Sequence, residues 1–186
     1  MAYRSNGNTP VVILTHSMGS VAAHHWLTRK VDQAWKDRCA IHLSIAVAHS
    51  ENQAKYCSLP PRHIRALVTL AGPWAGTVRS LKVYALGDDL GSFWVNTRSL
   101  RTQERSNPSL FWLMPSRLLW PAASEVLLQA ADVNITTDNM KDFFYTFGRP
   151  DGWEMYKDTK DLSAELEAPN VDVFCLHGSG IPTTNK

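Results

Sequence analysis

The chain has 186 residues, which is enough for one domain with a substantial core. Its composition, with 44% hydrophobic and 19% charged residues, is typical of a globular protein and excludes an intrinsically disordered one. The formal net charge of +2 is too small, and the basic residues are too scattered, to indicate a nucleic-acid partner.

The N-terminal residues give little indication of export. No apolar run approaches the roughly 20 residues of a membrane-spanning helix. The opening MAYRSNGNTP lacks the apolar region of a signal peptide, which taken literally indicates a cytosolic protein. The first predicted strand begins at residue 11 and leaves no room for earlier sheet elements, so we expect the natural protein to extend before Met1.

Three apolar runs predict buried strands of a parallel sheet. Val11–Thr15, Ile64–Leu70 and Val171–Leu176 are rich in β-branched residues, as strands covered on both faces are. The long connections between them favour an α/β fold. We also predict a helix from Met18 to about Lys30, with Ala22, Ala23, Trp26 and Leu27 on one shared face.

The stretch between the second and third strands does not have the pattern of a simple crossover helix. It contains a polar, arginine-rich segment and a predicted helix around Asn139–Phe147, and we interpret Asp151 as a turn residue. We therefore divide the chain into a partial core (1–79), an inserted cap or lid region (80–161) and a final core segment (162–186).

A serine at the end of the first strand has the pattern of a nucleophile elbow, which is small-x-Ser-x-small between a strand and a helix. In THSMG, Ser17 would be the nucleophile and the Met18 N–H would stabilise the oxyanion of a tetrahedral intermediate. Thr15 stands where the pattern usually has glycine. His16 is not the expected base, because adjacent residues on such a turn point apart.

The order of several motifs resembles one family. The segments HSMGS, QAWKD, IRALVTLAGPWAG, LMPSRLLWP, DGWEMYKDTKDL and VDVFCLHGSGIPT follow one another as they do in the lecithin:cholesterol acyltransferase and lysosomal phospholipase A family. The resemblance covers the chain from Val11 onward. It implies an α/β-hydrolase fold, with a central parallel sheet, a nucleophile elbow and an inserted cap.

The resemblance also implies a function. The family cleaves a fatty acyl group from a glycerophospholipid through an acyl-enzyme and passes it to water or to a lipid alcohol. It uses no metal or organic cofactor, and its members act at phospholipid membrane or lipoprotein surfaces. The implied location is lysosomal or secreted.

Carried over by position, the resemblance assigns Ser17 as the nucleophile and Met18 as an oxyanion donor. It places Asp88 and Asp89 at the start of a mobile lid that runs to about Ser109. It places an N-glycosylation site at Asn134 of the sequon Asn-Ile-Thr.

Three departures from the family's pattern affect these assignments. The family's catalytic Asp and His lie beyond the point where this chain ends, and its early strands precede Met1. About 25 residues intervene after QAWKD, and we interpret 38–62 as an atypical insertion, either a gene-model error or a genuine surface loop. Cys175 matches a family half-cystine whose partner would lie past Lys186.

Because two triad members are missing, we expect the 186 residues alone to be inactive and poorly folded. Two alternatives remain open: a related phospholipid:diacylglycerol acyltransferase, and a truncated, non-catalytic homologue that binds lipid or a partner. His177, which follows the third strand, is a candidate for a substitute base, with packing as the simpler explanation of its position. Cys39, Cys57 and Cys175 match no metal-ligand spacing.

Overall fold

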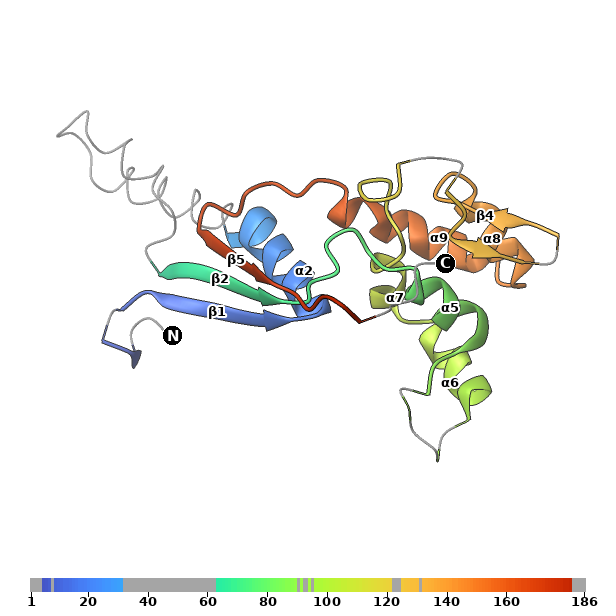
Figure 1. Ribbon diagram of the computed structural model, residues 1–186, viewed down its shortest axis with the longest axis horizontal. Helices are drawn as coiled ribbons and strands as arrows, with labels where there is room; N and C mark the ends of the chain where they lie inside the picture. The colour runs from blue at the N-terminus through green and yellow to red at the C-terminus, as the bar shows by residue number, and fades with distance from the viewer. Residues whose placement is uncertain are drawn as a thin grey trace, which may run out of the picture. The chain divides into compact units, whose positions relative to one another are not determined.

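The computed structural model describes residues 5–7, 9–31, 63–89, 91, 94, 96–121, 125–130 and 132–181. The chain divides into two compact units (Figure 1). Unit 1 comprises Met1–Gly72 and Glu167–Ser179, and unit 2 comprises Pro73–Leu166 and Gly180–Lys186. The predicted insertion at 38–62 lies outside the described residues, as do Cys39 and Cys57.

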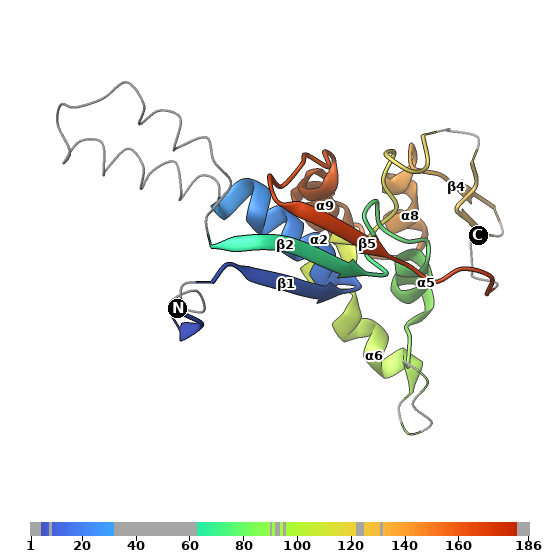
Figure 2. The same cartoon turned by 60° about the vertical axis from the view of Figure 1, so that its left-hand side comes forward.

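Unit 1 is built on parallel strands, as predicted. β1 (Val11–His16), β2 (Ile64–Leu70) and β5 (Asp172–Leu176) form a sheet in the order β1-β2-β5. Both pairings are parallel, with Leu14 opposite Val68 and Val68 opposite Phe174. The three strands therefore end at the same edge, where Figure 2 shows their arrowheads side by side.

Among the described residues, one helix covers one face of this sheet. α2 (Met18–His25) continues into a π-helical segment, η1 (Trp26–Val31), and the buried Leu27 packs with Ile64 and Leu67. The predicted helical face is wrong in one member, because Trp26 is exposed while its neighbour Leu27 is buried. The switch to π-helical turns changes the angular spacing of side chains, which a 3.6-residue period does not anticipate.

The opposite face of the sheet remains open among the described residues. Alternate residues of β1 point to it, so Val12 and Leu14 are 54% and 67% exposed. The prediction that Val11–Thr15 is covered on both faces is therefore wrong for the described residues. The prediction that the third strand is buried is wrong, because all five residues of β5 are exposed. Within unit 1, no described segment covers the apolar side chains of β5.

Unit 2 is mainly helical and has an aromatic core. Its helices are α5 (Arg79–Leu86), α6 (Thr97–Glu104), α7 (Pro108–Trp112), α8 (Met140–Thr146), α9 (Asp151–Thr159) and the 3₁₀ turn η2 (Lys160–Ser163). A short hairpin pairs β3 (Leu128–Gln129) with β4 (Asn134–Ile135). Tyr84, Phe111, Phe143 and Phe144 are almost fully buried, with ring centroids 5.2–5.9 Å apart.

The helix predicted around Asn139–Phe147 is confirmed as α8. The interpretation of Asp151 as a turn residue is wrong, because Asp151 is the first residue of α9. Pro150 precedes it with a helical backbone, and Arg149 donates two short hydrogen bonds to its carboxylate. This pairing lowers the pKa of Asp151. Proline followed by an acidic first turn was the overlooked signal of a helix start.

The arginine-rich segment has a structural role. Arg105 is buried and donates hydrogen bonds to the carbonyl oxygens of Tyr84 (2.7 Å) and Ala85 (3.5 Å). Arg101 also donates to the Ala85 oxygen, at 3.1 Å. The last carbonyls of a helix lack intrahelical donors, so these two arginines tie α6 to the C-terminal end of α5. Burial lowers the pKa of Arg105.

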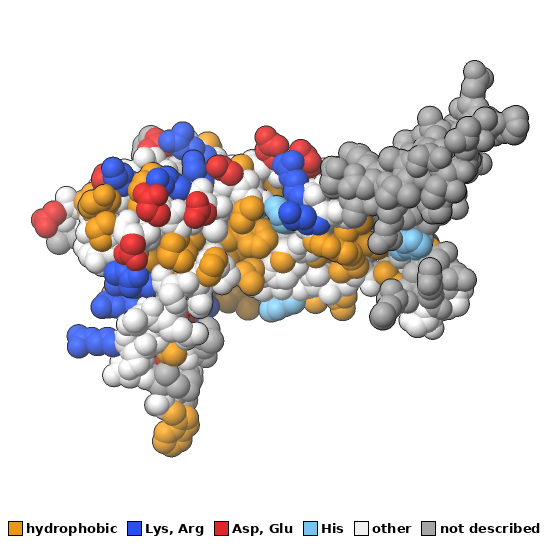
Figure 3. Space-filling view, turned by 180° about the vertical axis from the view of Figure 1, so that it is seen from behind, with side chains coloured by type: hydrophobic (Ala, Val, Ile, Leu, Met, Phe, Trp, Pro, Cys, Tyr) orange, Lys and Arg blue, Asp and Glu red, His pale blue; other side chains and the backbone are white. Residues whose placement is uncertain are grey.

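None of the described helices is long and apolar enough to cross a membrane. On the face shown in Figure 3, acidic and basic side chains lie interspersed among apolar ones. That face therefore carries no extended patch of charge of one sign.

Candidate active site

Ser17 occupies a sharp bend between β1 and α2. Its backbone has φ 51° and ψ −130°, a combination that side-chain-bearing residues rarely adopt and that costs about 1–3 kcal/mol. Ser17 is exposed, and its hydroxyl makes no capping hydrogen bond to α2, although serine commonly caps helices. The bend thus leaves the hydroxyl available at the carboxyl edge of the sheet.

Backbone hydrogen bonds hold this bend in place. The Ser17 N–H donates to the Leu70 carbonyl oxygen (2.9 Å). The Ser17 carbonyl oxygen accepts from the Ser20 N–H (2.9 Å). Met18 is the first residue of α2, where an α-helix supplies no acceptor for the N–H. The Met18 N–H is therefore a donor at the start of a helix, next to the Ser17 hydroxyl.

The end of the neighbouring strand also has a residue with positive φ. Ala71, which sequence reasoning did not single out, has φ 50° at the end of β2 and donates its N–H to the Leu176 oxygen at 2.8 Å. The following Gly72-Pro73 was the only sequence signal of a break there. Both strand ends bend sharply and are pinned to the next strand of the sheet.

The residues flanking Ser17 explain how Thr15 is accommodated. A Cβ built on Gly19 would lie 3.9 Å from the Thr15 Cβ, so the two positions face each other at ordinary contact distance. The Thr15 hydroxyl lies 3.2 Å from the Ser20 hydroxyl and 3.3 Å from the Val68 oxygen, which satisfies it in the partly buried turn. The turn therefore tolerates threonine at the first flanking position.

The described histidines do not assemble with Ser17 into a catalytic pair. His24 Nε2 lies 2.7 Å from the Glu167 oxygen and so holds α2 to the chain before β5. His177 follows β5, two strand spacings from β1, which is about 10 Å of backbone separation. Within the described residues, no group of three or more His, Cys, Asp or Glu side chains could hold a metal.

The predicted lid residues lie in unit 2. Asp88 accepts hydrogen bonds from the Arg79 guanidinium at 3.0 and 2.6 Å, and its N–H donates to the Glu104 carboxylate at 3.2 Å. Asp89 accepts from the Gly91 N–H at 2.9 Å. Asp88 thus connects the start of α5 to the end of α6.

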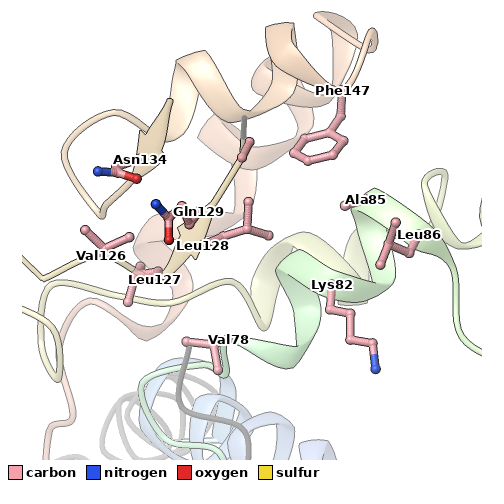
Figure 4. Close-up of a pocket in the computed structure, with 11 residues that line it drawn as sticks. Val78, Lys82, Ala85, Leu86, Val126, Leu127, Leu128, Gln129, Asn134 and Phe147 are labelled. Atoms are coloured by element: carbon pink, nitrogen blue, oxygen red, sulfur yellow. The ribbon is translucent and has the colours of Figure 1, made fainter. Parts of the chain in front are cut away.

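Asn134 is exposed on β4 at the edge of an apolar cavity. The cavity, about 790 Å³, lies between α5 and the β3–β4 hairpin (Figure 4). Val78, Ala85, Leu127, Leu128 and Phe147 supply its apolar surface. The exposure of Asn134 is what attachment of a glycan requires.

The parallel sheet with a serine at the strand-to-helix bend defines the class: an α/β protein whose architecture is consistent with a hydrolase-type fold. The chain belongs to the lecithin:cholesterol acyltransferase family, whose sequence model matches residues 1–186. The resemblance drawn from the motifs is therefore confirmed.

The curated relatives are enzymes of lipid acyl chemistry. The chain is 33% identical over 177 residues to the lysosomal phospholipase A and acyltransferase of Homo sapiens, covering 95% of this chain and 37% of the relative. It is 31% identical over 173 residues to the phosphatidylcholine-sterol acyltransferase of Gallus gallus, covering 93% of this chain and 36% of the relative. The chain thus spans little more than a third of the length of these relatives.

Proposed function

We propose that Ser17 is the nucleophile of a lipid acyltransferase or phospholipase. The observation that carries the proposal is its strained backbone at the end of β1, with the hydroxyl exposed and the Met18 N–H beside it. Strain of this kind persists only where the surroundings impose it, and it concentrates at active sites.

In this mechanism the Ser17 oxygen attacks the ester carbonyl of a glycerophospholipid while a histidine takes the hydroxyl proton. The Met18 N–H donates to the resulting oxyanion. Collapse of the intermediate breaks the ester bond, and the histidine returns the proton to the departing lipid alcohol. Water or a second lipid alcohol then attacks the acyl-enzyme and releases the acyl group.

The proton acceptor and its orienting aspartate are proposed to come from sequence outside these 186 residues, as the family resemblance implies. Removing such partners costs about 10⁴- to 10⁶-fold in rate. We therefore expect no measurable turnover from the 186-residue chain by itself.

Four further assignments belong to the same proposal. Asp88 to about Ser109 forms a lid, and Asn134 carries a glycan if the protein is exported. The relatives are named as lysosomal or as acting on phosphatidylcholine, which supports a lysosomal or secreted location and a lipid surface as partner.

A chimera tests the proposal. The 177 aligned residues of the human lysosomal relative are replaced by those of this chain, and fatty acid release from phospholipid vesicles is followed. We expect activity that Ser17→Ala abolishes and that Ser20→Ala, three residues away, retains.

A smaller graft that transfers only Val11–His25 covers the case in which the large chimera does not fold. Activity that survives Ser17→Ala in either graft would refute the assignment. A folded but inactive chimera would favour a non-catalytic homologue that binds lipid.

A further inference from the structure

A second cavity in unit 2 combines aromatic rings with charges of both signs. It has a volume of about 620 Å³, within the usual range for small-molecule sites. The cavity lies among the chain after α7, the start of α8, and α9 with η2. Its aromatic lining comes from Trp112, Trp153 and Tyr156.

These rings are held in fixed positions. The Trp112 indole N–H donates to the Ser163 hydroxyl at 2.6 Å. Trp153 and Tyr156 pack against each other with centroids 5.7 Å apart, and both contact the buried Phe144. Because the rings are already ordered, a ligand bound against them would lose little free energy in arranging them.

Charged side chains line the same cavity nearer to solvent. Arg117 is paired with Asp138, and the Lys160 amine lies 3.9 Å from the Asp161 carboxylate. The side chains of Arg117 and Asp161 are 68% and 77% exposed, whereas the three rings are half-buried. Burial and then Asp161 raise the pKa of Tyr156, and Arg117 opposes them, so both charges act on this ring.

We propose that this cavity binds a zwitterionic headgroup that carries a quaternary ammonium and a phosphate, with the ammonium against the rings and the phosphate at Arg117 and Lys160. A quaternary ammonium is attracted by aromatic faces and, being covered by methyl groups, is easily desolvated. Guanidinium groups recognise phosphate through paired N–H donors.

Simpler ligands fit the cavity less well. A purely apolar ligand would separate the charged pairs from water without replacing their interactions. A simple anion would face the carboxylates of Asp138 and Asp161. A zwitterion is the ligand whose charges match both signs.

The inference rests on the proposed function in one respect, which is that the headgroup belongs to a phospholipid. Binding itself does not require Ser17. Ser17→Ala should bind the headgroup as well as the wild type does, so failure of binding and failure of catalysis can be told apart.

Calorimetric titration of the full chain with soluble phosphocholine tests the site. We expect phosphocholine to bind at least about five-fold more tightly than choline, inorganic phosphate or phosphoethanolamine. The rim variants Arg117→Gln and Asp161→Asn should each weaken binding about three-fold or more. Lys157→Gln, on α9 but outside the cavity lining, is the matched control and should not change it.

Trp153→Leu should weaken phosphocholine binding more than either rim variant does. Tyr156→Phe keeps the ring and should weaken binding only slightly. If Trp153→Leu does not fold, the exposed rim variants still decide the question. Equal affinity for phosphocholine and its two halves, or rim variants that bind like the wild type, would overturn the proposal.

Vesicles distinguish a lipid headgroup from a free metabolite. Binding to phosphatidylcholine vesicles that soluble phosphocholine displaces would support the lipid source. Binding of soluble phosphocholine without vesicle binding would overturn the lipid assignment, as would vesicle binding that phosphocholine leaves unchanged.

Discussion

The strained backbone of Ser17 is the residue-scale feature on which the proposed chemistry depends. The strand before it and the helix after it fix its direction, and the Leu70 oxygen anchors its N–H at 2.9 Å. Ser17 makes no side-chain capping bond to α2. Its hydroxyl and the Met18 N–H therefore meet the geometric requirements of the proposed chemistry.

Replacing the Met18 N–H tests the oxyanion role without removing the nucleophile. Proline suits the first position of a helix, so Met18→Pro should keep α2 while deleting the donor. We expect the turnover of the chimera to fall about 10²- to 10³-fold. Met18→Ala keeps the N–H and should stay near wild-type activity. Equal activity of the two variants would show that this donor is not used.

At the scale of elements, the arginines of α6 and its end stabilise unit 2 through the C-terminus of α5. Arg105 is 8% exposed and its guanidinium lies 4.9 Å from the centre of the Tyr84 ring. A buried guanidinium that donates hydrogen bonds to helix carbonyls contributes more to the free energy of unfolding than a surface ion pair does.

Arg105→Met should therefore lower the free energy of unfolding by about 2 kcal/mol, since charged hydrogen bonds are lost and carbonyls remain buried. Arg98→Met, on the exposed side of α6, provides the control and should change it by less than about 0.5 kcal/mol. Urea unfolding followed by tryptophan fluorescence measures both. Indistinguishable midpoints would mean that Arg105 does not hold the two helices together.

The sequence predicted where strands form better than it predicted which of them are buried. The runs at Val11 and Ile64 predicted β1 and β2 because β-branched residues favour strands regardless of distant neighbours. The exposure of β5 was not predictable, because burial depends on which segments cover a strand. Arg105 was missed for the same reason, since its carbonyl partners lie about 20 residues away in sequence.

The sequence predicted only the parts of the site that are formed by residues adjacent in the chain. The bend at Ser17 followed from a strand, a serine, a glycine and a helix adjacent in sequence. The strained Ala71 and the aromatic cavity around Trp112 and Trp153 were not predicted, since each depends on residues brought together by the fold.

At the scale of the whole molecule, the open face of the unit 1 sheet exposes large apolar side chains. Parallel sheets are ordinarily covered on both faces, and apolar edges promote association. Leu14, Phe174 and Leu176 are each more than half exposed, at 67%, 55% and 52%.

We therefore expect the 186-residue chain to self-associate with increasing concentration. Leu14→Lys should shift it toward the monomer in sedimentation velocity, because a charge on this face opposes stacking and edge pairing. Gln103→Lys adds the same charge on the exposed surface of α6 and should not. A wild-type chain that stays monomeric at all concentrations would show that the face does not drive association.

Mass spectrometry can show whether Ser17 carries the acyl group. The chimera is quenched in acid while it turns over a phospholipid with one defined acyl chain. We expect the mass of that acyl group to be added to the peptide containing Ser17. Fragmentation should place it on Ser17, and Ser17→Ala should remove it. An acyl adduct on another residue would show that Ser17 is not the nucleophile. So would turnover without an adduct on Ser17 under conditions that trap the acyl-enzyme of the human relative.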